Sequence, residues 1–133
     1  MLNEIKSWLG IFLVLLILSG GCSVAEVTLN ASNDGGQQTL ARGQAVVVTL
    51  DSNPTTGYSW AVADVDNNVL RQVGDPVYQT ANSNPKVLGA GGAQIFRFEA
   101  ASAGTTTLKM VYRRSWETGV APIKTFTVQV TVR

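Results

Sequence analysis

The side chains in this sequence that could do chemistry are few, and their most distinctive grouping is the stretch Asn53-Pro54-Thr55-Thr56-Gly57-Tyr58. Pro54 fixes its own φ and Gly57 can take a positive φ at little cost, which together predict a stiff turn. Thr55 and Thr56 place two hydroxyls on that turn, available for hydrogen bonds. The pattern is typical of a binding loop, and taken alone it also fits an ordinary turn between two strands.

Two later segments have the same character. Gly89-Ala90-Gly91-Gly92 could be mistaken for a phosphate cradle, but neither the Lys-Ser/Thr of a P-loop nor a helix follows it. Arg114-Ser115-Trp116 places a cation and a large ring close together. Each of these segments, taken alone, also fits a flexible turn or a tripeptide of no specificity.

The sequence argues against enzymatic chemistry. It contains no histidine, which excludes the Ser-His-Asp and Cys-His arrangements and most zinc sites. Asp64 and Asp66 lie on a predicted turn, but the further oxygen ligands and final Glu of a calcium loop do not follow. The other carboxylates stand in no context that favours a glycosidase pair. We therefore expect no enzymatic activity, no cofactor and no metal.

The elements that must position these segments are β-strands. Apolar and polar residues alternate with a period of two through most of the chain, and no segment after the first residues shows a 3.6-residue apolar repeat. This pattern predicts an all-β fold, an immunoglobulin-like β-sandwich of about seven or eight strands, with a small barrel as the alternative. The predicted strands are 27–29, 44–50, 58–62, 69–73, 77–80, 94–99, 104–112 and 125–132.

Large apolar side chains must stabilise this fold, because the single cysteine, Cys22, excludes an intramolecular disulfide. Each such side chain contributes about 1.5–3 kcal/mol when it is fully buried. The core candidates are Trp60, Phe96, Phe98, Tyr112 and Phe126.

In this order and spacing, the three segments resemble those of the chagasin-like inhibitors of papain-like cysteine peptidases. That family carries an Asn-Pro-Thr-Thr-Gly-aromatic loop, a Gly-x-Gly-Gly loop with a phenylalanine a few residues on, and an Arg-Pro-Trp-like loop. The resemblance covers about residues 27–132, with Phe96 as that phenylalanine. Ser115 stands where the family usually has proline.

The resemblance implies a reversible, tight-binding inhibitor whose three loops lie at one end of the sandwich and form a wedge that enters the peptidase cleft. In the family the glycine loop spans the cleft and the other two loops grip its sides. The alternative function is an envelope-tethered adhesion or assembly module with no peptidase target. The residues expected to contact the peptidase are Asn53, Pro54, Thr55, Thr56, Gly57, Tyr58, Gly89, Ala90, Gly91, Gly92, Arg114, Ser115 and Trp116.

The first residues predict export. An apolar run from Trp8 to Leu18 precedes Ser19-Gly20-Gly21-Cys22, which fits a secretory signal and is too short for a membrane-spanning helix. The run before Cys22 also resembles a bacterial lipoprotein signal, with Leu18 one position further upstream than usual. We expect a signal peptide at 1–21, lipidation of Cys22, a tether at 22–25 and an inhibitor domain at 26–133. An uncleaved N-terminal anchor is the alternative.

Charge and residue 23 refine the expected partners and location. The net charge is +1 and 14% of the residues are charged, so no long-range field would hold nucleic acid phosphates. Ser23, rather than Asp, after the cysteine resembles sorting to the outer membrane. We expect a monomeric lipoprotein of the bacterial cell envelope, in the outer membrane or facing the periplasm, whose partner is a papain-like cysteine peptidase.

Overall fold

A computed structural model describes residues 25–80 and 91–133 of the chain. Nearly all the regular structure in these two ranges is β-strand, with two short 3-10 helices, and no helix there is long and apolar enough to cross a membrane. The elements are β1 (Val27–Leu29), η1 (Ala31–Asn33), β2 (Gln37–Leu40), β3 (Ala45–Ser52), η2 (Pro54–Thr56), β4 (Tyr58–Asp64), β5 (Leu70–Gln72), β6 (Val77–Thr80), β7 (Gly92–Ala100), β8 (Gly104–Arg114) and β9 (Lys124–Val132).

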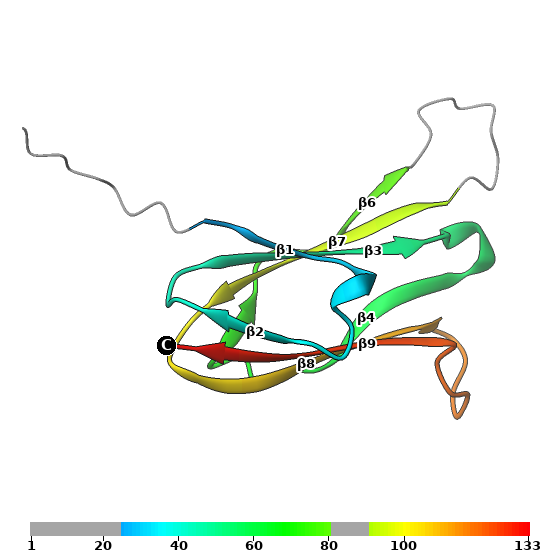
Figure 1. Ribbon diagram of the computed structural model, residues 1–133. Helices are drawn as coiled ribbons and strands as arrows, with labels where there is room; N and C mark the ends of the chain where they lie inside the picture. Colours follow the sequence, from blue (N-terminus) through cyan, green and yellow to red (C-terminus); the bar gives the residue numbers. More distant parts are fainter. Residues whose placement is uncertain (1–24, 81–90) are drawn as a thin grey trace, which may run out of the picture.

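The strands form two sheets that pack face to face (Figure 1). One sheet has the order β1-β3-β7-β5, and β6 also pairs with β7 beyond the end of β5. The other sheet has the order β2-β9-β8-β4. The pairs β1–β3 and β2–β9 are parallel, and all the other pairs are antiparallel. The predicted all-β sandwich is therefore confirmed.

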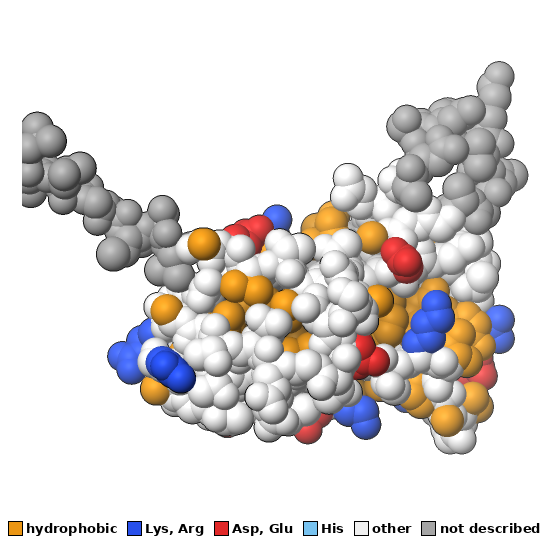
Figure 2. Space-filling view, viewed as in Figure 1, with side chains coloured by type: hydrophobic (Ala, Val, Ile, Leu, Met, Phe, Trp, Pro, Cys, Tyr) orange, Lys and Arg blue, Asp and Glu red, His pale blue; other side chains and the backbone are white. Residues whose placement is uncertain are grey.

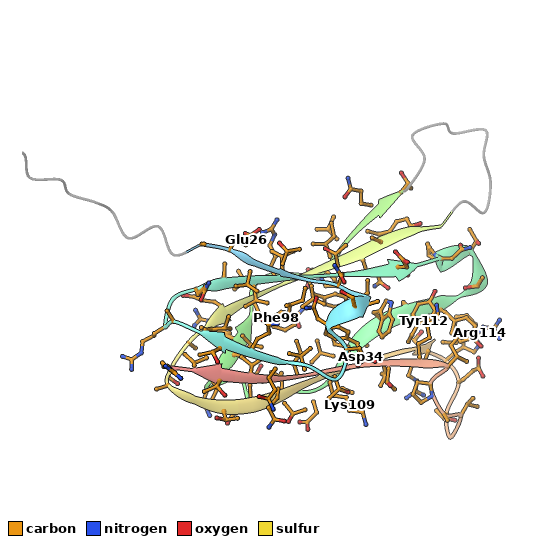
Figure 3. The ribbon with its side chains drawn as sticks, in the orientation of Figure 1. Glu26, Asp34, Phe98, Lys109, Tyr112 and Arg114 are labelled. Carbon is orange, nitrogen blue, oxygen red and sulfur yellow. The ribbon has the colours of Figure 1, made fainter. Side chains whose placement is uncertain are left out.

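The core lies between the two sheets because alternate residues of the long strands point inward. Phe98 lies in this interior in Figure 3, and Leu108, Met110, Val128 and Val130 are each completely buried. All the predicted core aromatics are buried: Trp60, Phe96, Phe98, Tyr112 and Phe126. Clean period-two alternation was thus a sufficient signal for the core.

The structure adds a ninth strand to the eight that the alternation predicted. β2 (Gln37–Leu40) buries only Leu40 and pairs in parallel with the second half of β9. A short edge strand with one buried residue leaves almost no periodic signal. It forms because the adjacent edge of β9 offers unpaired backbone groups.

Several predicted boundaries differ from the observed ones by one or two residues; Asp64, for example, was expected on a turn and ends β4. Two of these errors concern predicted site residues, Gly92 and Arg114. Gly92 belongs to β7 and not to the preceding loop, since it pairs with Ser52 on one side and Thr80 on the other. Arg113 and Arg114 belong to β8 and not to the break after it, because they pair with the start of β4. Pairing with neighbouring strands outweighs the turn-like composition of these residues.

The β3–β4 connection, the start of β7 and the β8–β9 connection all lie at one end of the sandwich, and the C-terminus lies at the other (Figure 1). The predicted signal peptide, the predicted lipidation site Cys22 and most of the predicted tether fall on residues 1–24, outside the described residues. Gly89 and Ala90 also fall outside them.

Candidate functional site

The segment Asn53–Gly57, which we call the threonine loop, is a capped 3-10 turn. Asn53 is the N-cap, and its Oδ1 accepts a hydrogen bond from the backbone N of Thr55 at 3.3 Å. Pro54 occupies the first turn, where its missing N–H costs nothing. Gly57 closes the turn with φ 80°, and its N–H donates to the Pro54 carbonyl at 2.9 Å. The sequence therefore fixes the loop's shape without help from a partner.

The two threonine hydroxyls are used inside this loop. Thr55 Oγ1 donates to Asn53 Oδ1 at 2.6 Å, and Thr56 Oγ1 donates to the Asn53 carbonyl at 2.6 Å. The sequence predicted hydroxyls that are available to a partner, whereas here both protons are committed within the loop. Because a hydroxyl oxygen also has two lone pairs, each exposed threonine can still accept a hydrogen bond from outside.

Tyr112 fastens the base of the threonine loop to β8. Its hydroxyl oxygen accepts a hydrogen bond from the backbone N of Asn53 at 3.0 Å, although Asn53 directly follows β3, which belongs to the other sheet. The Tyr112 ring centroid lies 5.5 Å from that of Tyr58 and 5.1 Å from that of Trp60. A buried tyrosine hydroxyl requires a partner, and here that partner positions a loop.

Gln94 connects the same region across the sandwich. Its Oε1 accepts hydrogen bonds from Ser52 Oγ at 2.9 Å and from the backbone N of Trp60 at 2.7 Å. One amide therefore holds β7, the end of β3 and the start of β4 together. Sequence reasoning missed this role, although the signal was present: Gln94 is a polar residue on the inward face that it shares with Phe96.

The described glycines of the second segment adjoin the threonine loop. A Cβ on Gly92 would lie 2.1 Å from the Gln79 carbonyl oxygen, so only glycine fits at this point. A Cβ on Gly91 would lie at an ordinary 3.6 Å from the Ser52 carbonyl oxygen. Packing against the described residues therefore requires glycine at Gly92 but not at Gly91.

Arg114 joins the third segment to the first. Its Nε donates to the Thr56 carbonyl at 3.0 Å, and its guanidinium carbon lies 4.5 Å from the centroid of the Tyr58 ring. Arg114 and Tyr58 are also direct partners in the β8–β4 ladder. Figure 3 shows Arg114 and Tyr112 at the same end of the molecule as the β3–β4 connection.

Trp116 makes the second link between these segments. Its side chain is 67% exposed, yet its indole ring lies so close to Gly57 that a Cβ there would stand 2.3 Å from the ring's Cη2. The glycine of the threonine loop is thus required both by its positive φ and by the ring beside it.

The segment 115–123, which we call the tryptophan loop, is closed by hydrogen bonds at its start. The backbone N of Glu117 donates to the Arg114 carbonyl at 3.2 Å, and the Arg113 guanidinium donates to the Glu117 carbonyl. An ion pair of 3.4 Å joins Arg114 and Glu117, and because it is partly exposed it adds little stability. These contacts constrain the turn at Ser115, where the resembled motif has proline.

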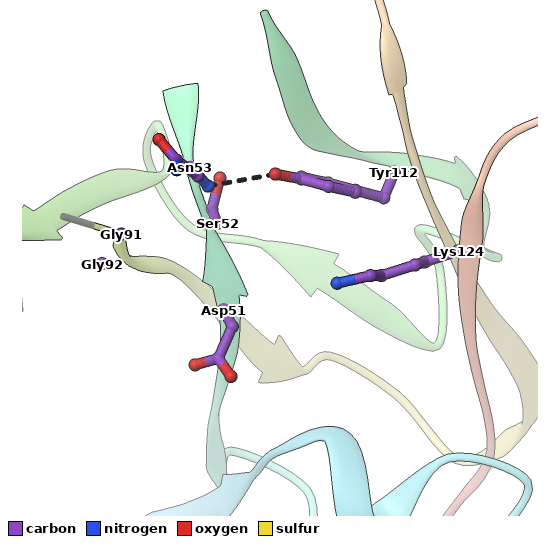
Figure 4. Close-up of a pocket in the computed structure, with 7 residues that line it drawn as sticks. All are labelled: Asp51, Ser52, Asn53, Gly91, Gly92, Tyr112 and Lys124. Carbon is purple, nitrogen blue, oxygen red and sulfur yellow. Dashed lines mark hydrogen bonds between the residues drawn. The ribbon is translucent and has the colours of Figure 1, made fainter. Parts of the chain in front are cut away.

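An open depression of about 370 Å³ lies beside the threonine loop, between the strands of the two sheets (Figure 4). Ser52, Asn53 and the two glycines form one wall, and Tyr112 and Lys124 form the opposite one. Lys124 places its ammonium 5.3 Å from the centroid of the Tyr112 ring. The end of the molecule is therefore hollowed between the two sheets.

The structure brings together all the predicted site residues that it describes, at one end of the sandwich. Asn53 to Tyr58, Gly91 and Gly92, and Arg114 to Trp116 are linked by strand pairing and by the contacts above. Their contact with a peptidase stays a prediction. Tyr112 was predicted only as a core residue, and Gln94 was not predicted as a site residue.

This architecture defines a binding protein that presents a braced cluster of loops. The model of the chagasin family peptidase inhibitor I42 matches residues 39–130. Amoebiasin-1 of Entamoeba histolytica is 31% identical over 109 residues, which are 80% of this chain and 100% of that protein. Chagasin of Trypanosoma cruzi is 30% identical over 89 residues, which are 64% of this chain and 78% of that protein.

A solved structure also shows the same fold. It is the crystal structure of the cysteine protease inhibitor EhICP2 of Entamoeba histolytica, which matches with a TM-score of 0.72 and 23% identity over 81% of this chain and 96% of that one. The chain belongs to the chagasin family of peptidase inhibitors. Since this is a family of inhibitors and not of enzymes, the expectation that the protein is not an enzyme is confirmed.

Proposed function

We propose that the protein is a reversible, tight-binding inhibitor of papain-like cysteine peptidases and that it fills the active-site cleft with its three loops. The observation that carries this proposal is the bracing of the threonine loop by Arg114 and Trp116 at the same end of the sandwich as Gly91 and Gly92. Membership of the chagasin family supports it, as does the shared fold of a cysteine protease inhibitor.

The glycine segment suits the centre of the cleft. Gly91 has no Cβ, and nothing within the described part of this protein crowds that position closer than 3.6 Å. The missing side chain lets the backbone pass close to a catalytic cysteine. Packing does not explain glycine at this position, whereas close approach to an enzyme does.

The flanking loops suit the walls of the cleft. Trp116 exposes most of a large rigid ring, the kind of side chain that is enriched among binding hot spots. Thr55 and Thr56 have donated their own protons to the loop, so they accept hydrogen bonds from donors on the enzyme. Inhibition follows because the cleft is occupied by backbone that the peptidase does not cleave.

Preorganisation makes the binding tight. The contacts of Asn53, Tyr112, Arg114 and Gln94 hold the loops before binding, so little conformational entropy is lost on association. An interface of about 800 Å² per partner is standard. With such loops we expect nanomolar affinity, on the order of −12 kcal/mol.

A titration tests this function. The purified protein is added to papain that hydrolyses a fluorogenic peptide, and residual activity is followed to equilibrium. We expect nanomolar inhibition by one inhibitor per enzyme, full recovery of activity on dilution, and an inhibitor of unchanged mass. Full papain activity at micromolar folded protein would refute the proposal. If a pull-down then recovered envelope proteins or glycans but no peptidase, the adhesion module would be favoured.

We further propose that the mature protein begins at Cys22 and is anchored by lipid to the bacterial cell envelope. The proposal rests on the order of an apolar run, small residues and one cysteine in the sequence. Expression in a bacterium should place the protein in the membrane fraction, with a mass that lacks residues 1–21 and includes acyl chains. The Cys22→Ser variant should lose the acyl mass. Equal masses apart from the substitution would reject lipidation.

A further inference from the structure

The tryptophan loop carries more exposed apolar surface than the proposed wedge uses. Among the described residues, three of the six large hydrophobic side chains that are exposed lie in this loop: Trp116 at 67%, Val120 at 51% and Ile123 at 56%. Scattered exposed apolar residues need no explanation, but a concentration of them marks an interaction surface. Figure 2 shows hydrophobic side chains gathered at the end of the molecule where this loop lies.

The loop presents Val120 and Ile123 from a constrained backbone. At its start, Glu117 is held by Arg113 and by the Arg114 carbonyl. At its end, the backbone N of Ile123 donates to the Tyr112 carbonyl at 3.0 Å. Side chains on a constrained loop lose less entropy on binding than those on a free one.

Val120 adjoins the proposed wedge, and Ile123 lies three residues further along the same loop. Val120 shares a small hollow with Tyr58 and Arg114, the two residues that connect the threonine loop to β8. The segment 118–123 that carries both aliphatic side chains reads Thr-Gly-Val-Ala-Pro-Ile and has no charge. Its composition matches an apolar partner surface and offers no ion-pairing group.

We propose that Val120 and Ile123 form an apolar ledge that binds an apolar patch on the rim of the target peptidase, outside the cleft and on the side of Trp116. This inference rests on the proposed function and adds a specificity-determining contact to it. Trp116, Val120 and Ile123 belong to the same loop and are all exposed, so an enzyme that binds the tryptophan lies close to the two aliphatic side chains.

The test compares three purified proteins as inhibitors of papain. They are the wild type, the double variant Val120→Ser/Ile123→Ser, and the control Val73→Ser. Val73 is 46% exposed and lies just beyond β5, away from the tryptophan loop. We expect the double variant to raise the inhibition constant about tenfold, mainly through faster dissociation, and the control to leave it unchanged.

The possible outcomes distinguish a failure of the proposed ledge from a failure of the proposed inhibitory function. If the wild type does not inhibit papain, the proposed function fails. If the wild type inhibits and the folded double variant inhibits equally well, the ledge is refuted and the function stands. Sedimentation of each protein gives the third outcome: a dimer of the wild type that the double variant abolishes would assign the ledge to a second copy of this chain and overturn the proposal. Equal melting temperatures show that the substitutions leave the fold intact.

Discussion

The indole ring of Trp116 lies against Gly57, so close that a Cβ on the glycine would stand 2.3 Å from the ring's Cη2. The two residues belong to different loops. They meet because Tyr58, next to Gly57, and Arg114, two residues before Trp116, are partners in the β4–β8 ladder. The threonine loop and the tryptophan loop therefore form one unit. A substitution in either loop should therefore alter the conformation of the other.

The Gly57→Ala variant should inhibit papain more weakly than a variant that loses the same stability at a site away from the loops. Alanine at φ 80° costs about 1–2 kcal/mol of stability, and its methyl group displaces Trp116. Gly43→Ala is the matched control, because Gly43 has φ 86° but nothing within 4 Å of an added Cβ. Both variants should melt at lower temperature, while only Gly57→Ala inhibits papain more weakly. Equal inhibition by the two variants would show that the contact with Trp116 does not matter.

Removing the exposed ring should affect binding and not folding. Trp116→Ala should weaken inhibition by about 2 kcal/mol or more, and because the ring is 67% exposed the melting temperature should barely change. Trp60→Ala provides the contrast: Trp60 is 7% exposed and donates to the Asp51 carbonyl, so its loss should cost about 3–5 kcal/mol of stability. A large fall in melting temperature for Trp116→Ala would place its role in the fold.

A lysine at position 114 should not preserve the inhibitory activity that Arg114 supports. The Arg114 Nε donates a hydrogen bond to the Thr56 carbonyl while the planar guanidinium stacks over the Tyr58 ring. The ammonium of lysine is not planar and cannot make both contacts at once. We expect Arg114→Lys to weaken inhibition about tenfold, or about 1.4 kcal/mol. Arg71 and Glu99 form an exposed ion pair within the sheet that does not contain Arg114. The Arg71→Lys variant alters this pair and should leave inhibition unchanged. Full inhibition by Arg114→Lys would mean that charge alone suffices.

Removing one hydroxyl should loosen the threonine loop without changing the core. Tyr112→Phe keeps the stacked ring but leaves the backbone N of Asn53 without the acceptor that now lies at 3.0 Å. The loss should cost about 1 kcal/mol of stability and weaken inhibition several-fold. Amide hydrogen exchange gives the specific readout, because exchange at Asn53 should accelerate while the centre of β8 stays protected. Unchanged exchange at Asn53 would show that the tyrosine does not hold the loop.

The alternation of apolar residues was enough to predict the sandwich, because every second side chain of the long strands must enter one core. It could not predict β2, whose only buried residue is Leu40 and whose pairing depends on an available edge of β9. Gly92 was assigned to a loop for a similar reason, since composition does not reveal that the Gln79 carbonyl lies where a Cβ would be.

The residues of the candidate site were predictable as a set, whereas their connections were not. The motifs at Asn53, Gly91 and Arg114 are visible in the sequence, and so is the spacing between them. The bonds of Thr55 and Thr56 to Asn53 depend on rotamers that the sequence does not specify. The packing of Trp116 on Gly57 depends on the register of two strands far apart in the chain.

Binding to papain with its cleft open and with its cleft filled tests the central claim most directly. One papain sample is left active, and the other is first blocked by a small irreversible peptide inhibitor that occupies the cleft. Insertion of three loops into the cleft predicts nanomolar binding to the open enzyme and at least a thousandfold weaker binding to the blocked one, a difference of about 4 kcal/mol. Equal affinity for the two samples would contradict the account, because the protein would then bind the peptidase somewhere other than its cleft.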